Sequence, residues 1–167
     1  MKGENHMIAK EPKALVYRPG EAETLPVGDM NVTFLASGEE TDGALSIMEF
    51  RVPESGGGTG LHIHLAEHEM GYVLEGTCQF TIGEQIGTLN AGDWTFIPKG
   101  TPHEFKSGGG QGPFRVLGIF SPAGFEGYFK ELSHLLTAAS SPPDPSAFAA
   151  LGQKYHISFL NTGERKT

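Results

Sequence analysis

Hydrophobic and polar residues alternate along short stretches through much of the chain. Runs rich in β-branched and aromatic side chains cover residues 32–36, 46–52, 70–74, 77–82, 94–97 and 114–120. Such runs are typical of β-strands, in which successive side chains point to opposite faces of a sheet. The chain's 24 glycines and 11 prolines are scattered rather than clustered in one linker, which implies many short turns. The pattern predicts an all-β fold, either a compact barrel or a jelly roll.

Two dipeptides beside these runs indicate tight turns. Glu75-Gly76 separates residues 70–74 from 77–82, and Gly83-Glu84 follows the second of these runs. Glycine adopts a positive φ without strain, and the two-residue turns of β-hairpins need such positions. We therefore expect a β-hairpin at each dipeptide.

The pattern takes a helical period after Pro122. Apolar side chains recur there at steps of three and four, at Phe125, Tyr128, Phe129, Leu132, Leu135 and Leu136. This spacing predicts an amphipathic helix, with Ser121 as its N-cap and Pro122 at its first position. A second, shorter helix is expected over residues 144–154, followed by a last strand at 157–159.

The change of pattern divides the chain into two parts. Residues 8–124 are expected to form the barrel, and residues 125–160 a C-terminal helical extension packed on it. Residues 1–7 and 161–167 are expected to be flexible ends. With 167 residues, 38% of them hydrophobic and 19% charged, the chain has enough apolar material for one folded domain.

Charge and cysteine content exclude several classes of partner and site. Twelve Lys and Arg against twenty Asp and Glu give a formal net charge of −8, which repels nucleic acid and anionic membranes. A single cysteine excludes an internal disulfide and multi-cysteine zinc sites. The chain has no run of 18 apolar residues and no apolar leader segment. We expect a soluble, cytoplasmic protein that binds neither nucleic acid nor membrane.

Three histidines and one glutamate have a spacing that suits a metal site. His62 and His64 lie two residues apart in an extended segment, so both imidazoles point to one face. An antiparallel return after a short turn would bring Glu69 back to that face. His103 follows a Pro- and Gly-rich turn that leads into another strand, and could be the fourth ligand. Three imidazoles and one carboxylate suit one divalent transition metal, and do not select among Fe, Mn, Co, Ni, Cu and Zn.

The strands around these residues predict an apolar pocket. Val73 is in step with Glu69, Phe105 is in step with His103, and Phe80 belongs to another apolar set. We expect these side chains to line a substrate pocket that favours an apolar or aromatic molecule. The alternative is that they are core residues only, since apolar side chains inside a barrel pack there first.

The aromatic residues at the start of the expected helix could likewise belong to the pocket or to the core. Phe125, Tyr128 and Phe129 either close one mouth of the barrel as a lid or seal its core.

Two sequence motifs resemble those of the cupin superfamily. They are Gly56-x5-His62-x-His64-x4-Glu69-x6-Gly76 and Gly92-x5-Pro98-x-Gly100-x2-His103. The resemblance covers residues 44–120, and it departs only at Ser107, where the family often has Asn at a position that is not a ligand. It implies a small β-barrel in which His62, His64, Glu69 and His103 hold one metal ion at its centre.

A narrower resemblance is to the quercetin 2,3-dioxygenase-like group of single-domain cupins. It rests on the sequence Tyr-Val-Leu-Glu-Gly at residues 72–76, the expected aromatic helix at 125–136 and the Pro-Pro-Asp-Pro segment at 142–145. The resemblance implies a metal-dependent dioxygenase that cleaves an enolic, flavonol or related aromatic substrate with O₂. It also implies a double role for Glu69, as metal ligand and as the base that accepts the substrate's hydroxyl proton.

Two other functions remain open, because the same four ligands also occur in cupins of other activities. One is a metal-dependent non-oxidative enzyme, such as a decarboxylase, lyase or cyclase, which a lack of O₂ dependence would reveal. The other is a metal- and ligand-binding barrel without catalysis. Cupins commonly pair through barrel edges, and edge strands need protection, so we expect a homodimer.

Overall fold

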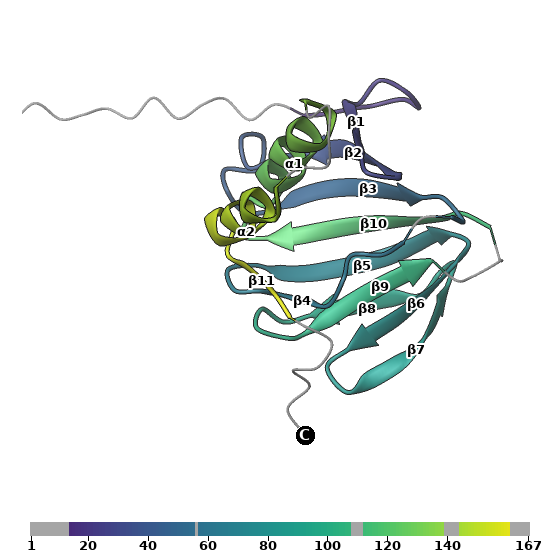
Figure 1. Cartoon of the computed structure of the whole chain (residues 1–167). Coiled ribbons are helices and arrows are strands. Elements are labelled where there is room, and N and C mark those ends of the chain that lie inside the picture. Colours follow the sequence, from purple (N-terminus) through teal and green to yellow (C-terminus); the bar gives the residue numbers. More distant parts are fainter. Residues whose placement is uncertain (1–13, 56, 108–111, 139–143, 161–167) are drawn as a thin grey trace, which may run out of the picture.

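Two antiparallel β-sheets face each other in the computed structural model, which describes residues 14–55, 57–107, 112–138 and 144–160 (Figure 1). The six-stranded sheet consists, in spatial order, of β1 (Thr24–Val27), β2 (Met30–Ala36), β3 (Ser46–Val52), β10 (Phe114–Ser121), β5 (His68–Glu75) and β8 (Trp94–Ile97). The five-stranded sheet consists of β11 (Ile157–Phe159), β4 (His62–His64), β9 (His103–Ser107), β6 (Thr77–Ile82) and β7 (Gln85–Asn90).

The protein is an all-β barrel of the jelly-roll type with two short C-terminal helices, as the pattern predicts. Each predicted run forms a strand, and β4 and β9 are the extended segments that carry the histidines. The strands β1 and β7 were not predicted from the sequence. Neither has the marked enrichment in β-branched and aromatic residues that identifies the predicted strands. The flexible ends predicted at residues 1–7 and 161–167 lie outside the described residues.

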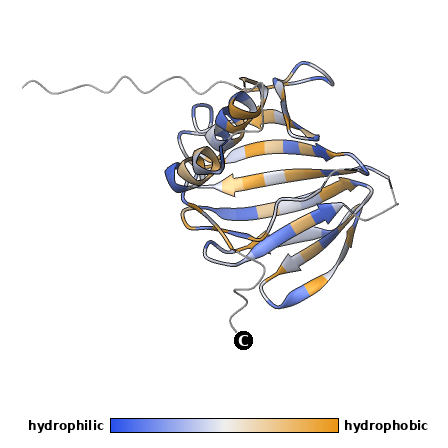
Figure 2. Ribbon diagram, viewed as in Figure 1, coloured by the Kyte–Doolittle hydropathy of each residue, from blue (hydrophilic) through white to orange (hydrophobic). Residues whose placement is uncertain are grey.

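Alternation along the strands separates the interior of the barrel from its surface. Figure 2 shows hydrophobic and hydrophilic segments following one another along the strands. Val32, Met48 and Val73 are at most 1% exposed and belong to the inner faces of β2, β3 and β5. Their exposed or half-buried neighbours point outward, as a period of two requires.

One of the two predicted hairpins is present and the other is wrong. The turn at Gly83 joins β6 to β7, which pair directly from Ile82 and Gln85 onward. Gly76 also has a positive φ, but there the chain passes from β5 in the six-stranded sheet to β6 in the five-stranded one. A positive φ indicates a sharp turn, and it does not determine whether the flanking strands pair.

The two helices are α1 (Glu126–Ala138) and α2 (Pro145–Lys154). Figure 1 shows them together at one end of the sheets, where α1 contacts β1 and β3 and buries Tyr128, Phe129 and Leu132. The second helix begins as predicted, with Asp144 Oδ1 accepting a hydrogen bond from the Ser146 amide at 2.9 Å. No helix in the described ranges is long and apolar enough to span a membrane.

The N-cap predicted for the first helix is wrong. Ser121 ends β10, and its hydroxyl donates a hydrogen bond to the Ala44 carbonyl at 2.9 Å. The helix starts five residues later, at Glu126, whose carboxylate accepts hydrogen bonds from the amides of Gly124 at 2.7 Å and Gly38 at 2.8 Å. The strand extends through Ser121 because its pairing with His68 of β5 continues to that residue.

The C-terminal extension supplies a strand to the barrel as well as helices. β11 pairs antiparallel with β4, so that Ile157 lies opposite His64 and Phe159 opposite His62. The extension is therefore continuous with the five-stranded sheet. The division at residues 124 and 125 stays a prediction.

Replacing Gly76 with Ala should destabilise the barrel more than the same change at Gly83. Both glycines have a positive φ, which costs another residue about 1–2 kcal/mol. A Cβ at Gly76 would also lie 2.3 Å from the Pro113 carbonyl oxygen, whereas one at Gly83 would meet nothing closer than 3.9 Å. We expect the clash to add about 1–3 kcal/mol for Gly76→Ala. Urea denaturation of both variants measures this, and equal losses would contradict it.

Candidate metal centre

Both sheets contribute side chains to one buried cluster. The β4 strand carries His62 and His64 on the same face, and His62 lies directly opposite His103 of β9. Glu69 lies on β5, in the other sheet, so it reaches the histidines across the interior. The predicted face is therefore correct, but the predicted antiparallel return is wrong, because β4 and β5 do not pair.

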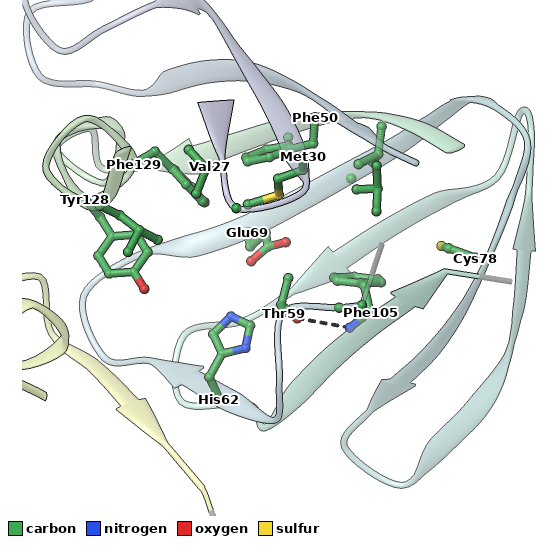
Figure 3. A pocket seen from close by; sticks show the side chains of 18 of the residues that line it. Val27, Met30, Phe50, Thr59, His62, Glu69, Cys78, Phe105, Tyr128 and Phe129 are labelled. Atoms are coloured by element: carbon green, nitrogen blue, oxygen red, sulfur yellow. Dashed lines mark hydrogen bonds between the residues drawn. The ribbon is translucent and has the colours of Figure 1, made fainter. Parts of the chain in front are cut away.

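The four side chains lie close enough to share one ion. Each offers a ligand atom, and these atoms all lie within 4.8 Å of one another. Glu69 Oε2 is 3.2 Å from His64 Nε2 and 3.1 Å from His103 Nε2. The three histidines are 1–7% exposed. Figure 3 shows Glu69 and His62 on different walls of the same cavity.

Backbone carbonyl groups orient two of the three imidazole rings. His62 Nδ1 lies 2.9 Å from the Gly60 carbonyl oxygen, and His103 Nδ1 lies 2.9 Å from that of Thr101. A hydrogen on each Nδ1, donated to the carbonyl, leaves the Nε2 lone pair available to a metal. The Nδ1 of His64 is buried and has no such partner.

Burial and neighbouring charges shift the pKa values of three members of the cluster. Burial, with the charges of His103 and His64, lowers the pKa of His62 to about 4, so its imidazole is neutral near pH 7. Burial would raise the pKa of Glu69, but hydrogen bonds with His103 and His64 outweigh it and hold the pKa below its usual range. Burial would lower the pKa of His103, but the hydrogen bond with Glu69 and the charge of Glu69 outweigh it and raise the pKa. Imidazole nitrogens and a carboxylate oxygen are donors that fit a divalent transition metal, whose binding would compete with the proton on His103.

A cavity of about 420 Å³ adjoins the cluster and is lined mainly by apolar side chains. Both sheets and α1 contribute to its wall, and the hydrogen bond from the Phe105 amide to Thr59 Oγ1 ties β9, the central strand of the five-stranded sheet, to the loop before β4 (Figure 3). The polar side chains in the wall include His62, His64 and Glu69, together with Asp29, Thr59 and Thr95. The cavity therefore offers a mainly apolar space with candidate metal ligands in its wall.

Two of the three residues predicted to contact a substrate lie in the wall of this cavity. They are Val73 and Phe105. Phe80 lies elsewhere, beside a smaller hollow that Glu104 and Lys106 also line. Its ring covers Gly87 of the paired strand β7, where the lack of a side chain leaves room for it.

The aromatic residues at the start of α1 line the cavity and also belong to the core. Phe125, Tyr128 and Phe129 are 3–8% exposed and pack with Phe120. The Phe125 ring meets the ring of His64 edge-on, with centroids 4.3 Å apart. The lid and the core interpretations therefore describe the same contacts.

Two parts of the site have no counterpart among the residues singled out from the sequence. Residues 27–30, at the turn between β1 and β2, line the cavity although their segment has no strong strand pattern. Glu67 is 6% exposed and lies near His64. Its signal in the sequence is an acidic residue three positions after a ligand histidine, which is too common to identify a site.

Comparison with known proteins identifies the family. Residues 48–120 match the cupin domain family. The quercetin 2,3-dioxygenase of Bacillus subtilis is 32% identical to this chain over 105 residues, which make up 60% of this chain. The match spans only 30% of the length of that enzyme.

Solved structures share the barrel. KdgF from a Halomonas species superposes with a TM-score of 0.59 at 19% identity, over 68% of this chain and 98% of its own, which shows a likeness of fold. The polyketide cyclase RemF from Streptomyces resistomycificus superposes with a TM-score of 0.55 at 26% identity, over 65% of this chain and 80% of its own. Together with the two motifs and the jelly-roll topology, these similarities identify residues 48–120 as a cupin domain.

Proposed function

We propose that this cupin is a metal-dependent dioxygenase that cleaves an enolic, flavonol-type or related aromatic substrate with O₂. The observation that carries the proposal is the cluster of three histidines and Glu69 beside a mainly apolar cavity. The similarity to the B. subtilis quercetin 2,3-dioxygenase supports the choice of reaction.

His62, His64, His103 and Glu69 would hold one divalent transition metal. Their nitrogen and oxygen donors are compatible with Fe, Mn, Co, Ni, Cu or Zn, and do not discriminate among them. When bound, such an ion acts as a Lewis acid that favours the ionised form of a substrate hydroxyl group.

Glu69 is the group in the site that can take up the substrate's hydroxyl proton. It is ionised, lies beside the ligand nitrogens, and has an oxygen within 3.1 Å of His103 and 3.2 Å of His64. The two imidazoles hold the carboxylate in place, so a proton accepted by Glu69 stays next to the reacting oxygen. We assign Glu69 both roles, metal ligand and base.

The cavity wall would hold the aromatic part of the substrate and exclude water. Val73, Phe105 and Phe125 present apolar surface next to the cluster. Apolar surroundings also favour entry of O₂, which is itself apolar. A strongly polar molecule, such as a sugar, would leave its hydroxyl groups without partners on these walls.

A non-oxidative reaction at the same site is the second candidate. Among non-oxidative reactions, the similarity to the polyketide cyclase RemF, at 26% identity, favours a cyclisation. The third candidate is a metal- and ligand-binding barrel without turnover. Consumption of O₂ with substrate separates the first candidate from the other two. A cytoplasmic location stays a prediction from the sequence.

His62→Ala and His103→Ala should each lose most of the metal bound by the wild-type protein. Each change removes one of four ligands, while the barrel has other core contacts that keep it folded. Mass spectrometry of metal content per chain, on protein purified without a nickel column, measures the loss, and circular dichroism checks the fold. Unchanged metal content in both variants would refute the ligand set.

Glu69→Gln should retain some metal but lose most O₂ consumption with a flavonol substrate. The amide keeps a ligand oxygen but cannot accept a proton, and loss of a positioned base typically costs about 10²–10⁴-fold in rate. An oxygen electrode measures the rate, after reconstitution with each metal. If the wild-type protein transforms its substrate equally well without O₂, the dioxygenase proposal is wrong.

The homodimer predicted from the sequence has a suitable surface on the six-stranded sheet. Tyr72 and Leu74 of β5 and Trp94 and Phe96 of β8 are 38–56% exposed on its outer face. Tyr72 lies directly opposite Trp94 in the paired strands, so the patch is continuous. The strand β8 is also at the edge of the sheet. Soluble monomers rarely expose a large apolar patch, and we propose that a second copy of the chain covers it.

Phe96→Asp should convert the dimer to a monomer, because it introduces a charge into this patch. Ile86→Asp is the matched control, since Ile86 is 69% exposed but lies on β7 of the other sheet. Light scattering after gel filtration measures the mass against the 17.9 kDa of one chain. A monomeric wild-type protein at micromolar concentration would contradict the homodimer.

A further inference from the structure

Two buried polar atoms next to the candidate metal centre face each other without a hydrogen-bond partner. They are His64 Nδ1 and Glu67 Oε2, which lie 3.9 Å apart. The side chains are 2% and 8% exposed. Burial of a polar atom without a partner costs free energy, so two such atoms side by side call for an explanation.

The other two histidines of the cluster show what is missing at His64. The Nδ1 atoms of His62 and His103 each lie 2.9 Å from a backbone carbonyl oxygen. An imidazole that binds a metal through Nε2 carries its hydrogen on Nδ1, and that hydrogen needs an acceptor. At His64 the nearby acceptor is the Glu67 carboxylate.

The backbone around the pair is held on both sides. The Leu65 amide donates to the His156 carbonyl at 2.9 Å, and the Gly100 amide donates to the His64 carbonyl at 2.8 Å. Through the bond to His156 and the pairing of β11 with β4, the C-terminal extension holds the backbone at His64 and Leu65.

We propose that Glu67 is a positioning residue, whose carboxylate accepts the Nδ1 hydrogen of His64 and so orients Nε2 toward the metal. The inference rests on the metal centre proposed above. Glutamate has three rotatable side-chain bonds, so a small rotation is enough to shorten 3.9 Å to a hydrogen bond of about 2.9 Å. The C-terminal extension then has a role in the site, because it covers and holds this contact.

The test compares Glu67→Ala and Glu67→Gln with Glu104→Gln. Glu104 is 7% exposed, close to the 6% of Glu67, but its partners are Thr81 and Lys106. The probe is Zn²⁺, titrated against a chromophoric chelator, and the second readout is the His64 Nδ1–H signal in ¹H–¹⁵N spectra of the zinc-loaded proteins. Thermal unfolding of the metal-free proteins reports any purely structural effect.

Glu67→Ala should weaken zinc binding by about 10–100-fold and move the His64 Nδ1–H signal. It should not lower the melting temperature of the metal-free protein, because it removes a buried carboxylate oxygen, Oε2, that has no hydrogen-bond partner there. Glu67→Gln keeps an acceptor oxygen and should weaken binding less, and Glu104→Gln should change the affinity by less than about twofold.

Two results would overturn the inference in distinguishable ways. If Glu67→Ala binds zinc as the wild-type protein does, with an unchanged His64 signal, Glu67 has no positioning role while the metal centre stands. If the wild-type protein binds no zinc or any other divalent transition metal, the metal centre itself is refuted, and the role of Glu67 with it.

Discussion

The contact on which the site depends is that of one partly buried carboxylate with two imidazoles across the interior of the barrel. Glu69 belongs to the six-stranded sheet, whereas His64 and His103 belong to the five-stranded one. A carboxylate that is largely removed from water needs partners of opposite or polar character, and here the partners come from the facing sheet. The position of one sheet relative to the other therefore sets the geometry of the candidate ligands.

The C-terminal extension completes this arrangement in two ways. Phe125, just before its first helix, packs against the His64 ring, and Tyr128 and Phe129 of the helix add aromatic side chains to the cavity wall. Its last strand pairs with β4, so that the strand carrying two histidines is flanked on both sides. A three-residue strand has few hydrogen bonds of its own, and a neighbour on each side limits its freedom. The extension thus contributes to the precision of the site although it provides none of the four candidate ligands.

Several features of the fold were accessible from the sequence because their cause is local. Alternation of apolar residues predicted the main strands, a period of three to four predicted the first helix, and Asp144-Pro145 was correctly expected to start the second. The hairpin at Gly83 was predicted, but the one at Gly76 was not a hairpin, since its flanking strands belong to different sheets. Likewise, Ser121 looked like a helix N-cap, but pairing with β5 holds it in a strand. Local preference was overruled in both cases by a long-range strand contact.

The sequence by itself determined the all-β class and the C-terminal helices, because periodicity is a property of neighbouring residues. Motif spacing singled out His62, His64, Glu69 and His103 as candidate ligands. Only the tertiary structure decided that Glu69 meets the histidines from the opposite sheet, and that Phe80 covers a neighbouring glycine outside the cavity. It also brought residues of the β1–β2 turn and α1 into the cavity wall. These placements depend on which strands pair and which sheets face each other. Such choices are made by contacts between residues far apart in the chain, and no local pattern records them.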